Sequence, residues 1–556
     1  MAPGLFRWHD PFARAAPKNN RSDLMQRSGI EFHRPILFWV STAALVAGVL
    51  AHIPMYTMAA PLHYRLVGMP VDTMMLVGMF LILAGMAGAI YGLMPPKRVL
   101  LAAIRHEDAP FSLVTADHAP LTRAHWKLFA VLMVALIVDI MKPATLGFVV
   151  PGMSDEYGIS RQTASLLALS ALSGTAIGSL LWGMIADAMG RRCGILISSL
   201  MFVGTSICGA MPSFEWNLFM CFLMGASAGG LLPIAFTLMA ETVPAGHRGW
   251  MLVALGGIGT TAGYLTASLC AAWLEPDYSW RMLWFLNLPT GLALIALNRF
   301  LPESPRFLMH IGRNQEARQV LASYGVEVVD ADPAQAAAVP AVGGVRSLLR
   351  KPLLALTCAL VMCGLSWGLV NFGFLLWLPS NLRAMHLSGS PDALLAKAAF
   401  LALPGVLLVT WLYHRWSTFK TLVLFVLITA ATLFGFFLLG NSGTSSGLAF
   451  AALTVVLLAS VSGVIAMLIP YATEIYPLQV RGTGSGLVAA SSKLGGVAAA
   501  GLGVLGMFSS LPTSALIVAG ALVVSVILLA LRGVETRGRG LEEIAPGTPA
   551  QPAAEA

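Results

Sequence analysis

Fourteen apolar segments, most of them near 20 residues long, run through this chain. A helix needs about 20 apolar residues to cross a bilayer, and there only helices and closed barrels satisfy all their backbone hydrogen bonds. The chain is 57% hydrophobic and 11% charged, against roughly 25% charged residues in a soluble domain. We therefore expect an all-α integral membrane protein with helices at 36–60, 71–94, 127–151, 163–185, 194–212, 217–240, 251–274, 282–301, 353–379, 393–413, 421–440, 447–471, 483–507 and 513–531.

A nine-residue pattern occurs twice, each time at the end of a long apolar segment. It reads E-T-V-P-A-G-H-R-G at 241–249 and E-I-Y-P-L-Q-V-R-G at 474–482, so both copies fit E-x-x-P-x-x-x-R-G. Counted over all fourteen segments, the copies follow the sixth (217–240) and the twelfth (447–471). Internal repeats are typical of secondary transporters, whose site lies between the repeats.

The repeat predicts five regions. They are an N-terminal extension with two extra transmembrane helices (1–125), a first six-helix bundle (126–301), a cytoplasmic linker (302–352), a second six-helix bundle (353–535) and a disordered tail (536–556). The tail is rich in Ala, Pro and Glu, a composition that cannot bury enough apolar surface to fold.

Loop charges predict the orientation. Lys and Arg gather in alternate loops and in the N-terminal arm, and cytoplasmic loops of membrane proteins carry such an excess. We expect both termini in the cytoplasm and the protein in a bacterial inner membrane. The formal charge of +8 then needs no nucleic-acid partner, and the six cysteines, all in or beside apolar segments, indicate small core residues and no metal site.

Two further motifs carry a family resemblance. G-M-I-A-D-A-M-G-R-R, at 183–192, resembles the G-x-x-x-D-x-x-G-R-R/K loop of the major facilitator superfamily. P-E-S-P-R-F-L, at 302–308, resembles the signature of sugar porters and of related organic-acid and aromatic-acid carriers. With the repeat, the chain resembles the sugar-porter and organic-acid, metabolite:proton symporter branch of that superfamily. The resemblance implies two six-helix bundles, transport by alternating access and no enzymatic activity; the extra N-terminal pair is not part of the usual twelve-helix pattern.

The same resemblance implies a group of gating residues that closes the cytoplasmic side. The two motif glycines leave room where helices approach and the loop turns, and Asp187 is expected to accept from a helix N-terminus and an arginine. Alternatively, the arginines only fix topology, and P-E-S-P-R only ends a helix and lets Arg306 reach the headgroups. The loop at 413–420 lacks the glycine and the aspartate, which predicts an asymmetric gate. The gating candidates are Gly183, Asp187, Gly190, Arg191, Arg192, Glu241, Arg248, Glu303, Arg306, Glu474 and Arg481.

Charged residues deep in the apolar segments indicate a substrate site. Asp139 and Lys142 share one helix face, and Pro143 leaves the carbonyl of Asp139 without its helical donor. Lys493 is a second deep cation, which leaves an excess positive charge that an anionic substrate would neutralise. Alternatively, Asp139 and Lys142 simply pair, and Lys493 is neutral or reaches the interface.

Asp139 also suits proton coupling, because burial and a nearby lysine shift a carboxyl pKa in opposite directions. Related symporters keep a second acid where Lys142 stands, so transfer of their aromatic-acid specificity is doubtful. Side chains that could hold a flat substrate, or else only pack against neighbouring helices, are Trp367, Asn371, Tyr264 and Tyr471.

The sequence predicts a monomeric secondary transporter that takes up a small organic anion with a proton. No pattern indicates a cofactor, a metal or a catalytic triad. The alternatives are a neutral-solute (sugar) porter, a drug exporter, and a non-transporting sensor or scaffold that uses the two extra helices to hold a partner.

Overall fold

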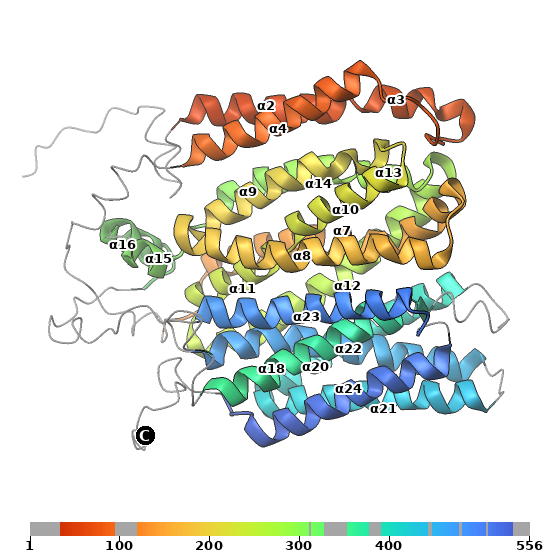
Figure 1. Ribbon diagram of the computed structural model, residues 1–556. Coiled ribbons are helices and arrows are strands. Elements are labelled where there is room, and N and C mark those ends of the chain that lie inside the picture. Colours follow the sequence, from red (N-terminus) through yellow and green to blue (C-terminus); the bar gives the residue numbers. More distant parts are fainter. Residues whose placement is uncertain are drawn as a thin grey trace, which may run out of the picture.

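The structure is a computed structural model that describes residues 34–94, 119–310, 313–326, 348, 353–375, 377–378, 391–442, 447–476, 481–507 and 510–537. Every regular element in these ranges is a helix, and the long helices lie side by side (Figure 1). Eleven helices within the same ranges are long and apolar enough to cross a membrane. The expected all-α membrane fold with an extra N-terminal helix pair is confirmed.

All fourteen apolar segments form helices, although several are interrupted. The extension contains α2 (Pro35–Leu50), α3 (Ile53–Met58), η1 (Ala60–Leu62) and α4 (Thr73–Leu93). The first half contains α7 (Arg123–Tyr157), α8 (Arg161–Met189), α9 (Arg191–Gly204), η2 (Thr205–Ala210), α10 (Phe214–Ala228), α11 (Leu231–Thr242), α12 (Ala245–Tyr278), α13 (Arg281–Phe285), α14 (Asn287–Leu297) and η3 (Asn298–Phe300). The second half contains α18 (Leu353–Gly368), η5 (Leu369–Phe374), α20 (Pro391–Arg415), α21 (Thr418–Asn441), α22 (Gly447–Ile475), α23 (Arg481–Val504) and α24 (Leu511–Arg532).

The helix of residues 214–242 is broken between α10 and α11 at Gly229 and Gly230. Side chains of α8 supply hydrogen bonds to the carbonyls at the break: the Trp182 indole donates to Ala226 at 2.7 Å, and the Ser179 hydroxyl donates to Gly229 at 2.8 Å. A Cβ on Gly230 would overlap the Trp182 side chain. The break therefore needs both the glycine and the tryptophan, since a backbone carbonyl left without a donor in a membrane is costly.

The helix that begins with α18 continues as a π-helix, η5, which contains Asn371 and Phe372. π-Helical turns are rare and often occur at functional sites. Before this turn, α18 lies against α23, and a Cβ on Gly368 would overlap the backbone of Ser492. Close approach through small residues is a common way for membrane helices to associate.

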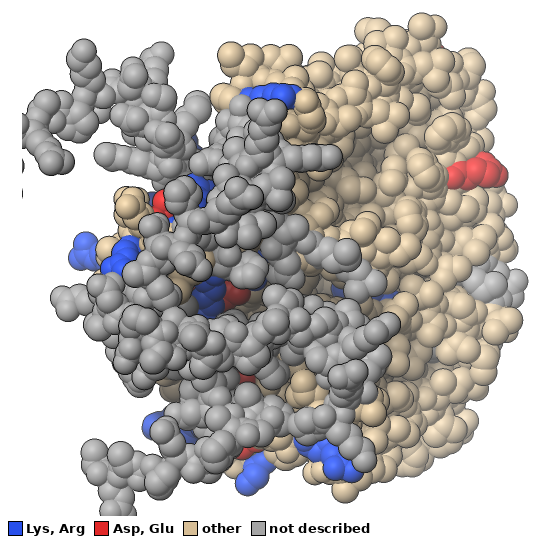
Figure 2. Space-filling model, turned by 60° about the vertical axis from the view of Figure 1, so that its left-hand side comes forward, with Lys and Arg blue, Asp and Glu red and all other residues tan. Residues whose placement is uncertain are grey.

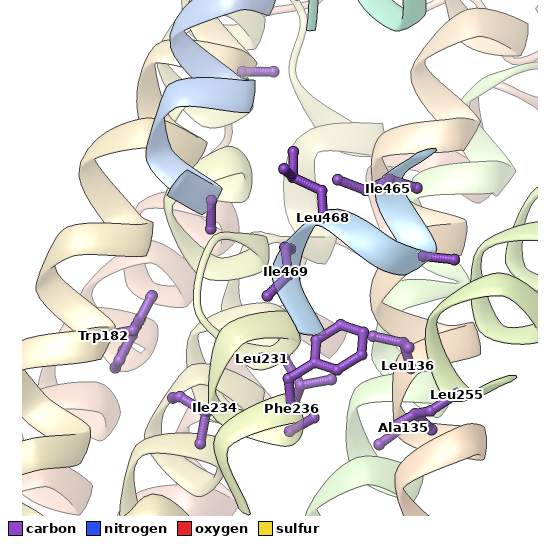
Figure 3. Packing of buried hydrophobic residues seen from close by; sticks show 14 of the residues in the cluster. Ala135, Leu136, Trp182, Leu231, Ile234, Phe236, Leu255, Ile465, Leu468 and Ile469 are labelled. Atoms are coloured by element: carbon purple, nitrogen blue, oxygen red, sulfur yellow. The ribbon is translucent and has the colours of Figure 1, made fainter. Parts of the chain in front are cut away.

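The two halves meet along α8 with α23 and along α12 with α20 and α22. Between them lies a set of buried apolar side chains, here called the apolar layer: Leu136, Phe236, Leu255, Ile465, Leu468 and Ile469. Figure 3 shows Phe236 of α11 beside Leu136 of α7, with side chains of α22 facing them. The layer joins side chains of α7, α11 and α12 in the first half to side chains of α22 in the second half.

The extension packs its α2 and α4 hairpin against α9. Its connecting loop contacts the first half through two hydrogen bonds: the Leu66 N–H donates to Oε1 of Glu156 at 2.8 Å, and the Tyr56 hydroxyl donates to the carbonyl of Tyr278 at 2.5 Å. Glu156 is itself in a buried ion pair with Arg281 at 2.7 Å. The extra helices are thus attached to the first half at both the helix faces and the loop.

The described chain begins and ends on one side of the molecule, where α15 (Pro305–His310) and α16 (Asn314–Ser323) also lie (Figure 1). We call this side the α15 end. Figure 2 shows Lys and Arg side chains gathered there, next to a flank that is almost entirely uncharged. The N-terminal arm, most of the linker and the tail beyond Arg537 lie outside the described residues.

Candidate transport site and gating clusters

Asp139 of α7 and Lys493 of α23 are electrostatic neighbours across the contact between the halves. The Asp139 side chain is buried, and Lys493 is half-buried. Among the described residues no hydrogen bond or ion pair joins the two groups directly. The two charges therefore attract each other across the contact between the halves without a direct bond.

Lys142 lies one turn further along α7, and its side chain points into the first half. Its ammonium donates to Oγ1 of Thr205 at 2.7 Å, to Oγ of Ser227 at 3.1 Å and to the carbonyl of Phe202 at 3.4 Å. The nitrogen also lies 3.7 Å from the centroid of the Phe202 ring. All three ammonium donors are therefore used by the protein, at the C-terminal end of α9, where the helix dipole favours a cation.

The rings of Phe372 and Trp367, here called the aromatic wall, lie beside Lys493. Its ammonium lies 5.3 Å from the ring centroid of Phe372 and 6.0 Å from that of Trp367. These two rings are perpendicular, and the Trp367 indole donates to the carbonyl of Val461 at 2.9 Å. The hydrogen bond fixes the indole, so its face is held toward the cation.

A small cavity continues from this wall into the first half. It has a volume of about 40 Å³ and is lined by residues of α7, α8, α10 and η5, among them Lys142, Pro143, Thr175, Met224 and Phe372. A cavity of this size holds a few waters, because one water needs roughly 10–15 Å³ of such volume. The lining is mostly apolar, which suits the flat face of a small ligand.

The remaining sequence candidates lie in different places. Asn371 is half-buried on η5, one residue from Phe372, and its amide makes no hydrogen bond to a described residue. Tyr264 is on α12, near Phe148, and is 37% exposed. Tyr471 is fully buried, and its hydroxyl exchanges two hydrogen bonds with the backbone of Val534 at 2.7 and 2.8 Å. The Tyr471 hydroxyl is therefore bonded to the chain that follows α24.

At the α15 end, Glu303 covers the N-terminus of α9. Its carboxylate accepts hydrogen bonds from the backbone N–H groups of Arg191 at 2.8 Å and Arg192 at 3.2 Å. These are donors that a helix cannot satisfy by itself. Burial raises the pKa of Glu303 above its ordinary value, and hydrogen bonds from the backbone of Ser304 and Arg191 oppose that rise.

The neighbours of Glu303 complete a first gating cluster. Arg191 forms an ion pair with Glu241 at 3.2 Å, and Ser304 donates a hydrogen bond to the same carboxylate at 2.5 Å. Gly190 has a φ of +99°, and a Cβ there would overlap the Glu303 carboxylate, so the turn requires glycine. A Cβ on Gly183 would meet no atom within 4 Å. Among the described residues no helix lies against Gly183, and the role expected for this glycine stays a prediction.

The second half repeats this arrangement with different residues. Glu535 accepts hydrogen bonds from Ser417 and from the backbone N–H of Thr418 at 3.0 Å, at the N-terminus of α21. Thr536 donates to Glu474 at 2.6 Å, as Ser304 does to Glu241. The loop at 413–420 lacks the motif, yet the helix that follows it is covered in the same way. The expected asymmetry is thus limited to the missing glycine and aspartate.

Arg248 and Glu474 connect the two clusters. Arg248 is buried on α12 of the first half and acts electrostatically on Glu474 of the second half, which also accepts from the Tyr413 hydroxyl at 3.1 Å. The side chains of Asp187, on α8, and Arg481, at the start of α23, lie outside the described residues. Arg306 is half-buried on α15.

The site includes residues that the sequence reading missed. Phe372 carries no distinguishing signal, because it lies in an apolar segment. Glu535 and Thr536 do carry one: E-S at 303–304 and E-T at 535–536 each follow the last helix of a half. Two bundles of membrane-spanning helices, with a carboxylate of one opposite an ammonium of the other, define a membrane transporter.

Comparison with known proteins agrees with this class. The family model described as Major Facilitator Superfamily matches residues 128–500, and the chain belongs to that family. The chain is 28% identical to the 4-hydroxybenzoate transporter PcaK of Acinetobacter baylyi, over 70% of this chain and 86% of that protein. It is 25% identical to the niacin transporter NiaP of the same organism, over 69% of this chain and 87% of that protein.

The fold also matches solved structures. The proton:xylose symporter XylE, bound to 6-bromo-6-deoxy-D-glucose, superposes with a TM-score of 0.61 at 19% identity, covering 76% of this chain and 98% of that chain. The expected transporter identity is confirmed, and the protein is not an enzyme.

Proposed function

We propose that this transporter takes up a small organic anion together with a proton. The observation that carries the proposal is the pair formed by Asp139 and Lys493 across the contact between the halves. Each is the kind of deep charged group that marks function in a membrane protein. The names of the relatives support the substrate class, since 4-hydroxybenzoate and niacin are both small aromatic carboxylates.

In this mechanism Lys493 binds the substrate carboxylate, and Phe372 and Trp367 contact its flat part. Without substrate, the negative charge of Asp139 balances Lys493. When a substrate carboxylate takes over that role, Asp139 loses its counterion and binds a proton from the open side, because an uncompensated buried carboxylate is costly. Substrate and proton then move together.

Lys142 has a different part in this proposal. Because its three donors are already bonded to Thr205, Ser227 and Phe202, it ties α7, next to Pro143, to α10 and to the end of α9. Lys142 also lines the small cavity next to Phe372, so its charge adds to the positive potential of the site.

The apolar layer gives the direction of access. Leu136 lies three residues, or about 4.5 Å, from Asp139 toward the α15 end. We propose that the α15 end faces the cytoplasm, in agreement with the loop charges, and that this conformation is closed on that side. The gating clusters hold it closed, and opening requires the contact of Arg248 with Glu474 to separate.

The experiment compares three variants in proteoliposomes. Lys493→Met should weaken binding of an aromatic carboxylate at least tenfold, whereas Lys142→Met should change binding less than it changes stability. Asp139→Asn imitates the protonated acid, so it should retain binding and exchange but lose accumulation driven by a proton gradient. The coupling role of Asp139 is disproved if Asp139→Asn still concentrates substrate when a proton gradient is imposed.

A binding screen separates the substrate classes. Purified protein is heated with aromatic carboxylates, aliphatic carboxylates and neutral sugars, and only anions should raise Tm in a manner that depends on Lys493. Stabilisation by sugars alone would instead identify a neutral-solute porter.

A further inference from the structure

Two cations from different helices converge on one aromatic ring at the α15 end. The Lys127 ammonium, on the second turn of α7, lies 4.9 Å from the ring centroid of Phe300. The Arg299 guanidinium, on η3, lies 4.5 Å from the same centroid. Since each charge is within 5 Å of the centroid, the two charges are less than about 10 Å apart, close to the screening length at physiological salt.

The position of η3 is fixed by a buried contact with α9. Arg192 donates from Nε to both the carbonyl and Oδ1 of Asn298 at 3.1 Å, and Asn298 donates back to the carbonyl of Arg192 at 3.1 Å. Asn298 is buried, whereas Arg299 and Phe300, the next two residues, are exposed. The buried contact of Asn298 therefore holds η3 in place, and the side chains of Arg299 and Phe300 extend outward from it.

Among the residues that the structure describes, neither cation has an acidic partner. In the part of the chain that the structure describes, no carboxylate lies within ion-pair distance of Lys127 or Arg299. Cation–π contacts compensate each charge only in part, and like charges this close repel each other. The surroundings also indicate a membrane interface, because Trp126, next to Lys127, is 49% exposed.

We propose that Lys127, Arg299 and Phe300 form a binding site for the phosphate of an anionic phospholipid, with an acyl chain against the exposed Phe300 ring. A phosphate between the two cations would neutralise their repulsion, and basic pockets between transmembrane helices commonly bind such headgroups. A free phosphate has the same charge chemistry but no acyl chain to contact the exposed ring, which favours the lipid.

Native mass spectrometry of the full-length protein in detergent tests the site. Phosphatidylglycerol is titrated, with phosphatidylcholine as the zwitterionic comparison. The double variant Lys127→Gln/Arg299→Gln should bind phosphatidylglycerol roughly 30-fold more weakly, since each basic residue near a membrane surface contributes about 1 kcal/mol. The charge-conserving double variant Lys127→Arg/Arg299→Lys should retain binding.

Two controls make the result specific. The double variant Arg65→Gln/Arg532→Gln removes two exposed charges elsewhere and should bind like the wild type. Inorganic phosphate is added as a competitor and should not displace the lipid. The proposal is overturned if the wild type and Lys127→Gln/Arg299→Gln bind phosphatidylglycerol equally well. For this comparison the two proteins should have the same Tm in phosphatidylcholine. Displacement by millimolar phosphate would overturn the lipid assignment, because it identifies a free-anion site.

Discussion

A Cβ atom on Gly249 would lie 3.3 Å from Oε1 of Glu474, although these residues belong to different halves of the chain. Gly249 ends the first copy of E-x-x-P-x-x-x-R-G, and Glu474 begins the second copy. The same Cβ would lie 3.3 Å from the Tyr413 ring. The two copies of the repeat therefore meet at the α15 end, and the last position of the first copy has little room for a side chain.

Gly249→Val should hold the α15 end apart. Its branched side chain has no room beside Glu474 and Tyr413, so the closed state becomes less stable and transport falls by about tenfold or more. The matched control is Gly246→Val, one turn earlier on α12, where a Cβ would meet no atom within 4 Å. Alkylation of a cysteine at Asn371 should become faster from the α15 side in Gly249→Val only. Equal labelling rates in both variants would show that this contact does not govern access.

Glu535→Gln should make stability less dependent on pH. Burial alone would raise the pKa of Glu535, but hydrogen bonds from Ser417, Thr418 and the backbone of Arg537 lower it below its ordinary value. A lowered pKa stabilises the folded state above roughly pH 4.3, the ordinary glutamate value, and this stabilisation disappears as pH falls through the folded-state pKa. The difference in Tm between wild type and Glu535→Gln should be largest near pH 7 and vanish in acid. A difference that stays constant down to pH 3.5 would contradict this role.

Glu156→Gln should loosen the attachment of the extension. The Glu156 carboxylate accepts from the Leu66 N–H and forms the buried ion pair with Arg281, so the amide leaves a buried charge uncompensated. Removal of one partner of a buried pair costs about 3–5 kcal/mol. Thermal unfolding in detergent measures the loss. Asp72→Asn, an exposed residue of the same loop without a side-chain capping bond, should leave Tm unchanged.

Gly230→Ala and Gly520→Ala should have opposite effects. A Cβ on Gly230 overlaps Trp182, so the variant must displace the side chain that supports the break between α10 and α11. A Cβ on Gly520, in the middle of α24, meets nothing within 4 Å, and alanine in a helix is favoured over glycine by about 0.5–1 kcal/mol. Tm should fall in the first variant and rise slightly in the second. A neutral Gly230→Ala would mean that Trp182 can move without loss.

The helices and their order could be predicted from the sequence because apolar length decides them. Each segment from 36–60 to 513–531 forms helix, and the deep charges Asp139, Lys142 and Lys493 were found because charged residues stand out in apolar segments. The interruptions could not be predicted. Gly229 and Gly230 break a helix, whereas Gly256 and Gly257 lie within one, and the difference comes from Trp182 and Ser179 on a neighbouring helix.

The partners of the charged residues also could not be predicted. The spacing of Asp139 and Lys142 places them on one helix face, but Lys142 bonds to Thr205 and Ser227 because the end of α9 and the end of α10 lie beside it. Helix periodicity gives the direction of a side chain relative to its own helix. It does not give the identity of the helix that faces the side chain. That identity decides whether a lysine ties its own helix to a neighbour or faces a ligand.

The π-helical turn of η5 has a consequence for how this protein can evolve. A π turn holds one residue more than an α turn, so deletion of a single residue within Leu369–Phe374 would restore regular α-helix. Every residue beyond the deletion would then rotate by roughly 100° relative to Trp367, which comes before it. Relatives could thus acquire a new ligand preference by a one-codon change in length, while the amino acids around the site stay the same.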